Sequence, residues 1–181
     1  MKFNLKDLQN KKQLCEIYTN DSDTGKFSVG YIIFYDKHWC CIQSFNQYGK
    51  QDGTILVSIE DIIRIQTCTT YLKNIEKLIN YYGKQKDAEL LKLKEGDVFD
   101  SYCDFLLINK KICSIEICNS NVNDLHGIIE KNFDLGLEIK IIDENGKIDG
   151  FSTIEKMAVT SMSSGSEEEK MLEILYNINE K

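Results

Sequence analysis

Residues 49–53 read Gly-Lys-Gln-Asp-Gly, and residues 146–150 read Gly-Lys-Ile-Asp-Gly, 97 positions later. The similarity extends to both sides of this loop, at an offset of 97 or 98 residues. The matched pairs outside the loop are Gly30 with Gly127, Cys15 with Cys113, Ile75 with Leu172, and Leu78 with Leu175. A shared order of features over about 65 residues predicts a structural unit that occurs twice in the chain.

Hydrophobic periodicity predicts the same elements in each unit: a short helix, five short strands and a trailing helix. Runs of alternating apolar residues indicate the strands, and apolar residues three and four apart indicate the helices. In the first unit the predicted helices span 3–10 and 71–82, and the predicted strands span 13–19, 27–35, 38–45, 54–59 and 62–67. In the second unit a helix opens at Phe99, strands span 112–118, 125–133, 137–142, 150–155 and 157–162, and a terminal helix follows Ser164 or Ser166.

The chain contains no proline, so its turns depend on Gly, Asn and Asp. Five bent antiparallel strands in about 60 residues suit a small closed barrel, because closure leaves no exposed strand edge. We therefore expect a mostly β fold with flanking helices (α+β), built as two tandem five-stranded barrels. The predicted domains are residues 1–93 and 94–181, with the first trailing helix resuming over residues 87–93.

Composition is that of an ordinary globular protein, with 42% hydrophobic and 28% charged residues. The chain has no apolar run of about 18 residues, and its first residues lack the apolar stretch of a signal peptide. We therefore expect no membrane association and a cytoplasmic location. The two halves differ in charge: residues 1–90 carry 12 Lys and Arg against 11 acidic residues, whereas residues 91–181 carry 10 against 18. An acidic total of −7 with a single arginine disfavours non-specific nucleic-acid binding.

Seven cysteines are present, an odd number, and no two of them form a Cys-x-x-Cys pair. This pattern predicts neither a disulfide framework nor a metal site, and the two histidines do not change that expectation. We expect the cysteines to be small buried residues, since free cysteine is among the most buried residue types.

The first unit resembles an Sm-like protein, a family with an N-terminal helix followed by a bent five-stranded barrel. Gly30 and Asp36 stand at the spacing of the family's first motif, with apolar residues between them. Cys40 stands where the family has asparagine, and Glu60-Asp61 stands where it has Arg-Gly, so the residues that hold RNA bases are missing. The chain as a whole resembles two tandem Sm-like or SH3-like barrels, as in uncharacterised proteins of low-GC bacteria. The resemblance implies self-association, edge strand to edge strand.

Five residues of the first unit are candidates for ligand binding: Tyr35, Lys37, His38, Trp39 and Lys50. Aromatic faces can stack on bases, and the lysines can supply charge. The competing interpretations are half-buried packing for the aromatic residues and a glycine hairpin for the Gly-Lys-x-Asp-Gly loop, in which the glycines adopt positive φ. We favour these structural roles. The run Glu167–Glu169 is expected to be a solvated first helical turn, where the helix dipole favours acidic residues.

Catalysis has little support, because the sequence lacks nucleophile and phosphate-binding motifs, and His38 with Cys40 is the one candidate pair. We predict no catalytic residue, metal or cofactor. The leading hypothesis is a non-enzymatic binding or assembly module that acts through protein–protein contacts or self-association. The alternatives are RNA or nucleotide binding by the first barrel, and a small-molecule enzyme or ligand sponge.

Overall fold

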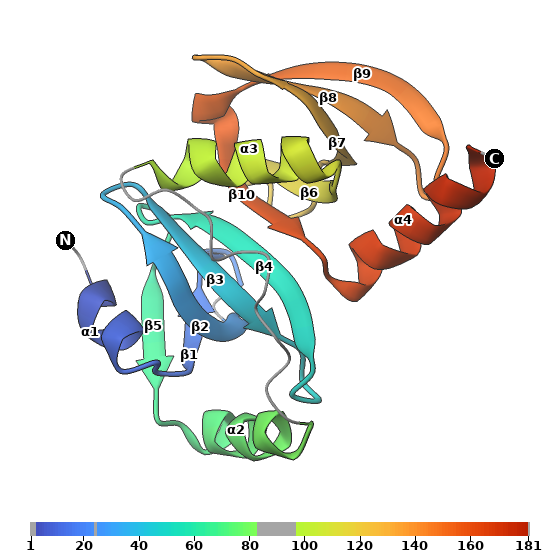
Figure 1. The fold of residues 1–181 in the computed structure, drawn as a ribbon. Coiled ribbons are helices and arrows are strands. Elements are labelled where there is room, and N and C mark those ends of the chain that lie inside the picture. The colour runs from blue at the N-terminus through green and yellow to red at the C-terminus, as the bar shows by residue number, and fades with distance from the viewer. Residues whose placement is uncertain (1–2, 24, 83–96, 181) are drawn as a thin grey trace. The chain divides into compact units, whose positions relative to one another are not determined.

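The computed structural model describes residues 3–23, 25–82 and 97–180 (Figure 1). The chain divides into two compact units, Met1–Val98 and Phe99–Lys181. The predicted boundary between residues 93 and 94, and the helix predicted to resume over 87–93, lie outside the described residues.

The first unit consists of five antiparallel strands with a helix before and after them. Its strands lie in the order β5-β1-β2-β3-β4, so the last strand pairs with the first. The elements are α1 (Leu5–Asn10), β1 (Cys15–Tyr18), β2 (Ser28–Tyr35), β3 (Trp39–Phe45), β4 (Gln51–Ser58), β5 (Arg64–Thr67) and α2 (Thr70–Tyr82).

The second unit has the same order of elements and the corresponding strand order, β10-β6-β7-β8-β9. A short 3-10 turn, η2 (Lys156–Ala158), precedes its last strand. The elements are α3 (Val98–Asn109), β6 (Ile112–Ile117), β7 (Leu125–Asn132), β8 (Gly136–Ile142), β9 (Ile148–Glu155), β10 (Val159–Ser164) and α4 (Glu167–Asn179).

The two units also agree in strand register. Cys15 pairs with Gly30, and at the matched positions Cys113 pairs with Gly127. The ladders between their second and third strands both shift register just beyond the same point, Ile32 and the matched Ile129. Most of the predicted elements are therefore present, and the mostly β fold with flanking helices is confirmed.

The prediction of closed barrels is not confirmed, because the sheet is open. Among the described strands, β4 does not pair with β5, and β9 does not pair with β10. Closing the barrel of the first unit would require β5 to pair with β1 along one edge and with β4 along the other. The strand β5 has four residues, and all four are paired with β1.

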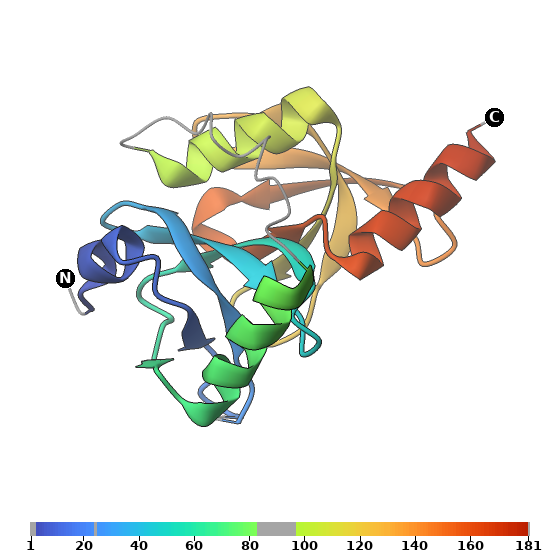
Figure 2. The same cartoon turned by 60° about the horizontal axis from the view of Figure 1, so that its bottom comes forward.

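Each trailing helix packs on the strands of its own unit. In the first unit α2 lies over the strands (Figure 2), and its inward residues join Leu14 and Val29 in a buried cluster. Those inward residues are Leu72, Ile75 and Ile79. In the second unit Leu172 of α4 packs on Ile112, Ile128 and Ile142. Each helix thus packs one apolar side on its own strands, as amphipathic spacing predicts.

The Gly-Lys-x-Asp-Gly loops are hairpin turns that touch these helices. Gly49 and Gly146 have φ values of +70° and +73°, a region that other residues rarely adopt. A Cβ atom at Gly146 would overlap Leu175 and the backbone nitrogen of Tyr176 in α4, and one at Gly49 would meet the matched positions of α2. The loop therefore needs glycine for two reasons, backbone conformation and close contact with the helix.

Replacing Gly146 should destabilise the protein more than replacing Gly150, which also has a positive φ (+96°) but where an added Cβ atom would have no neighbour within 4 Å. We expect Gly150→Ala to lower the free energy of unfolding by about 1 kcal/mol, the cost of a left-handed alanine. Gly146→Ala adds the overlap with α4, for a total of about 2–4 kcal/mol. Urea denaturation measures both changes, and equal losses would contradict a contact role for Gly146.

Candidate functional site

The predicted ligand residues of the first unit do not form one site. Tyr35, Lys37, His38 and Trp39 surround the turn between β2 and β3, whereas Lys50 lies in the turn between β3 and β4. These turns are at opposite ends of β3, whose seven residues span about 20 Å. The Lys50 ammonium lies 5.9 Å from the ring centroid of Tyr82, at the end of α2.

The β2–β3 turn is held by Asp36. One carboxylate oxygen of Asp36 accepts hydrogen bonds from the backbone N–H groups of His38 and Trp39, both at 2.7 Å. The side chain of Tyr35 is partly buried against the core, while Lys37 and His38 are exposed. Packing therefore accounts for Tyr35, and the turn presents one lysine and one histidine to solvent.

The pair His38 and Cys40 is not arranged as a nucleophile with its base. Cys40 is fully buried, whereas His38 is exposed in the turn before β3. Burial raises the pKa of the Cys40 thiol well above its ordinary value, with the neighbouring Cys41 as the next contribution. A thiol with a raised pKa is a poor nucleophile near neutral pH.

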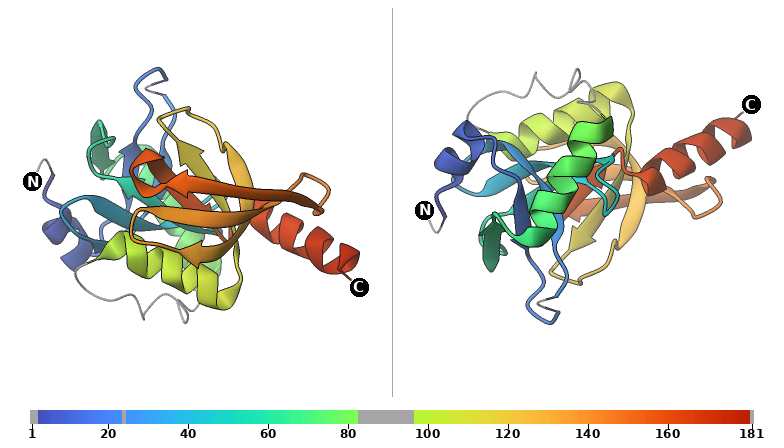
Figure 3. Two further views of the ribbon diagram at one scale, coloured as in Figure 1. Left: turned by 90° about the horizontal axis from the view of Figure 1, so that it is seen from above. Right: turned by 90° about the horizontal axis from the view of Figure 1, so that it is seen from below.

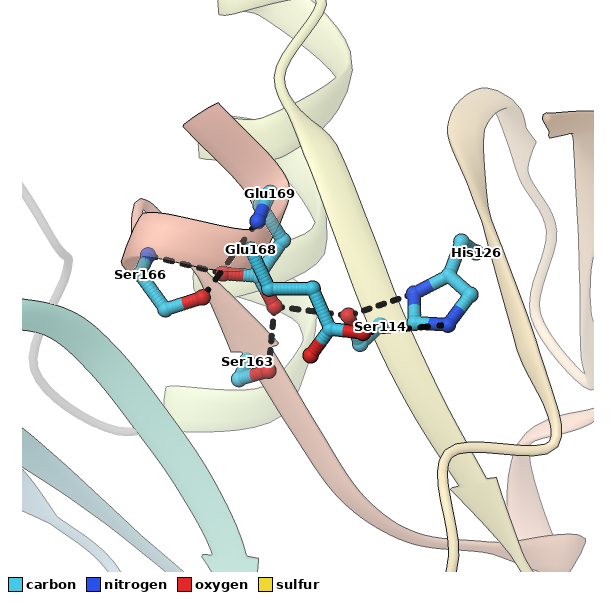
Figure 4. Close-up of polar contacts among 6 residues, drawn as sticks. All are labelled: Ser114, His126, Ser163, Ser166, Glu168 and Glu169. Carbon is cyan, nitrogen blue, oxygen red and sulfur yellow. Dashed lines mark hydrogen bonds and ion pairs between the residues drawn. The ribbon is translucent and has the colours of Figure 1, made fainter. Parts of the chain in front are cut away.

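A connected polar cluster lies in the second unit, beneath the start of α4 (Figure 4). The Ser114 hydroxyl, on β6, donates to Glu169 Oε1 at 2.6 Å and lies 2.8 Å from His126 Nδ1 on β7. Ser163 donates to the same Glu169 oxygen at 2.6 Å. Ser114 and Glu169 are 0% and 1% exposed, so the cluster is buried at its centre.

Hydrogen-bond capacity fixes the roles in this cluster. An ionised carboxylate accepts and does not donate, so the single Ser114 proton is directed to Glu169. The Ser114 oxygen then accepts from His126 Nδ1, which places a proton on that nitrogen. The other nitrogen of His126, Nε2, lies 3.9 Å from Glu168 Oε1.

The Glu169 carboxylate also closes a capping box. Its Oε2 accepts from the backbone N–H of Ser166 at 2.7 Å, and the Ser166 hydroxyl accepts from the Glu169 N–H. The carboxylate thereby satisfies N-terminal helix groups and lies at the positive end of the helix dipole. The expectation that residues 167–169 form a solvated turn is wrong for Glu169, because this side chain points into the protein. The spacing Ser166-x-x-Glu169 is the sequence signal for this arrangement.

The first unit also buries a carboxylate between its first strand and the start of its trailing helix. In this unit the strand supplies the carboxylate, whereas in the second unit the helix supplies it. Glu16 of β1 is 4% exposed and accepts from the Thr69 hydroxyl at 2.5 Å. Thr69 caps α2, since its hydroxyl accepts from the Leu72 N–H at 3.1 Å. Tyr18 Oη donates to the second Glu16 oxygen at 2.7 Å.

The matched positions of the two units carry the carboxylate on different elements. Glu16 and Leu72 in the first unit match Ser114 and Glu169 in the second. Each unit therefore has one carboxylate between its first strand and its helix start, supplied by the strand in one unit and by the helix in the other. With Ser114 fully buried, a substrate has no access to its hydroxyl, so the chemistry that this geometry supports is helix capping.

Within residues 3–23, 25–82 and 97–180, no three His, Cys, Asp or Glu side chains gather as a metal site would require. None of the described helices is long and apolar enough to cross a membrane. Comparison of the chain with protein-family models, curated proteins and solved structures gives no match in any of the three.

Exchanging the residues of this interface should show strong coupling. Glu169→Leu removes the acceptor of Ser114, Ser163 and the Ser166 N–H, and should cost about 2–4 kcal/mol of stability. Ser114→Glu alone places two carboxylates together and should also destabilise. The double variant restores the arrangement of the first unit, with one carboxylate. We expect its loss to be smaller than the sum of the single losses by at least about 1 kcal/mol, and additivity within about 0.5 kcal/mol would contradict this account.

The cysteines should fall into two reactivity classes. Cys15, Cys40, Cys41, Cys103 and Cys113 are buried, as predicted, whereas Cys68 and Cys118 are exposed, contrary to the prediction. Burial raises the pKa of Cys41 and of Cys113 to about 12. In the folded protein we expect a disulfide reagent to modify two thiols quickly and the other five after unfolding. The variant C68S/C118S should lose the whole fast phase, and a remaining fast phase would refute the assignment.

Proposed function

We propose that this protein is a non-enzymatic binding and assembly module that acts through protein–protein contacts, with strand pairing between chains as its mode of self-association. The observation that carries this proposal is the free edge of β9. Among the described strands, β9 pairs with β8 alone, and it is eight residues long. A long unpaired edge offers a row of N–H and C=O groups to another chain.

The side chains of β9 suit such a contact. Phe151 and Ile148 are 64% and 45% exposed, and the first four residues of the strand are all exposed. Natural proteins protect free edges with charged side chains, lysine above all, and with proline, β-bulges or short strands. The β8–β9 ladder contains one register shift. In β9 the charged residues are Asp149 and Glu155, and neither lysine nor proline is present.

A second free edge is available as the partner. The strand β5 pairs with β1 alone among the described strands, and it is the better protected of the two edges because it has four residues and begins with Arg64. Pairing β9 of one chain with β5 of the next is a head-to-tail contact, which builds a ring or a filament. The strand order, with the last strand beside the first, and the matched registers support an origin of the two units as duplicated Sm-like barrels.

Nucleic-acid binding by the first unit has less support. The candidate residues lie at two separate turns, and the chain carries a net charge of −7. Proteins that grip phosphate backbones present clustered positive charge.

Light scattering coupled to size exclusion tests the proposal. We expect the mass to rise with protein concentration, and Phe151→Lys to weaken association by roughly tenfold or more, because a charge on the edge opposes strand pairing. Val122→Lys is the matched control, since Val122 is 61% exposed in the β6–β7 loop of the same unit. A monomeric mass at high concentration, or equal effects of the two variants, would sink the proposal.

A further inference from the structure

The helix α4 has apolar residues on two opposite sides. Its inward side consists of Glu169, Leu172 and Tyr176, which contact the strands or the residues beneath them. The residues Met171, Ile174 and Ile178 have the same spacing of three and four but lie two positions further along the helix, on the other side. They are 59%, 55% and 63% exposed, and we call them the outer stripe.

The first unit shows that the fold does not require apolar residues at the positions of Met171 and Ile174. The positions of α2 that match Met171 and Ile174 are Asn74 and Lys77, both exposed polar residues, and the position that matches Ile178 is Tyr81, which is 83% exposed. The helix α2 nevertheless packs on its strands through the same inward positions as α4. Apolar residues at positions 171 and 174 of α4 therefore contribute nothing that the packing of this helix needs, and contiguous exposed apolar residues are a feature of contact surfaces.

The outer stripe is held in a fixed orientation. The capping box secures the start of α4, and near its end Asn179 donates from Nδ2 to the carbonyl oxygens of Asn145 and Gly146, at 3.0 and 3.1 Å. The helix α4 is the last element before the C terminus (Figure 3). A stripe fixed at both ends loses little conformational entropy when a partner binds.

Charge indicates the kind of partner. Residues 167–180 contain five glutamates and one lysine. Glu167 and Glu168 are exposed at the start of α4 and Glu180 is exposed after its end, with the exposed Lys170 as the one basic residue among them. Residues 91–181 as a whole carry 18 acidic residues against 10 lysines. A complementary surface has apolar residues flanked by Lys or Arg, and a second copy of this acidic unit does not meet that requirement.

We propose that the outer stripe is the docking surface for an amphipathic helix of a partner protein, with an apolar face flanked by Lys and Arg. Residues spaced i, i+3 and i+7 are the pattern by which a helix is recognised along two turns. This contact uses a different surface from the β9 edge, so each proposal can fail without the other. Electrostatic attraction makes the interaction weaker as salt increases.

The test uses a fluorescently labelled 18-residue Leu/Lys amphipathic peptide as the probe, with a Leu/Glu peptide of the same pattern as its control. We expect the Leu/Lys peptide to bind the full-length protein at least about tenfold more tightly, with affinity falling between 50 and 300 mM salt. Met171→Asn with Ile174→Lys gives α4 the polar outer residues of α2, and should weaken binding roughly tenfold or more. The variant Asn74→Ala with Lys77→Ala changes the same positions of α2 and should leave affinity unchanged.

Several outcomes would overturn the proposal. Equal binding of the two peptides would show general adhesion, and unchanged binding by the α4 variant would place the peptide elsewhere. If the α4 variant lowered the mass in light scattering, the stripe would be a contact between copies of this chain. Binding to anionic vesicles with no binding to the Leu/Lys peptide would indicate a lipid surface. Circular dichroism and melting temperature establish that each variant is folded, and Ile174→Lys alone provides a milder change.

Discussion

The packing of a trailing helix on its strands is the interaction on which each unit depends. It buries three helix residues in the first unit and completes the core around the first strand. It also restricts which residues fit in the neighbouring turn, since Gly49 and Gly146 each lie against the helix backbone. The conspicuous Gly-Lys-x-Asp-Gly sequence is thus explained by this contact, and its recurrence reflects a shared geometry.

The same contact creates an electrostatic problem that the two units solve differently. A helix that starts against strands leaves N–H groups and a capping hydroxyl in a buried place. The first unit supplies Glu16 from its strand, and the second supplies Glu169 from its helix. The surrounding donors differ accordingly: Tyr18 and Thr69 in one unit, and serines in the other. Hydrogen bonds to the helix start therefore add to the stability that the apolar contacts provide, because an unpaired buried polar group is costly.

Much of the secondary structure could be predicted, because it follows from periodicity and from turn residues. The strands β4 and β9 begin earlier than predicted, at Gln51 and Ile148, since the Gly-Lys-x-Asp-Gly sequences suggest turns but their last residues lie within strands, near a register shift. The open sheet was not predictable, because closure depends on how far strand ends lie from one another. The candidate residues Tyr35 to Lys50 are close in sequence, but β3 separates their turns. The polar cluster at Ser114 was missed because His126 and Glu169 come from distant segments, although Ser166-x-x-Glu169 was visible as a capping signal.

The exchange of the buried carboxylate has a consequence for folding. A chain with two similar units can dock the helix of one on the strands of the other, which is a known failure of repeated domains. If α4 docked on the first set of strands, Glu169 would meet Glu16, and two carboxylates would share one buried place. If α2 docked on the second set, Leu72 would supply no carboxylate to accept from Ser114 and Ser163. Both mismatched pairings carry a cost in free energy that the native pairings avoid. The position of the buried carboxylate therefore favours packing of each helix on the strands of its own unit.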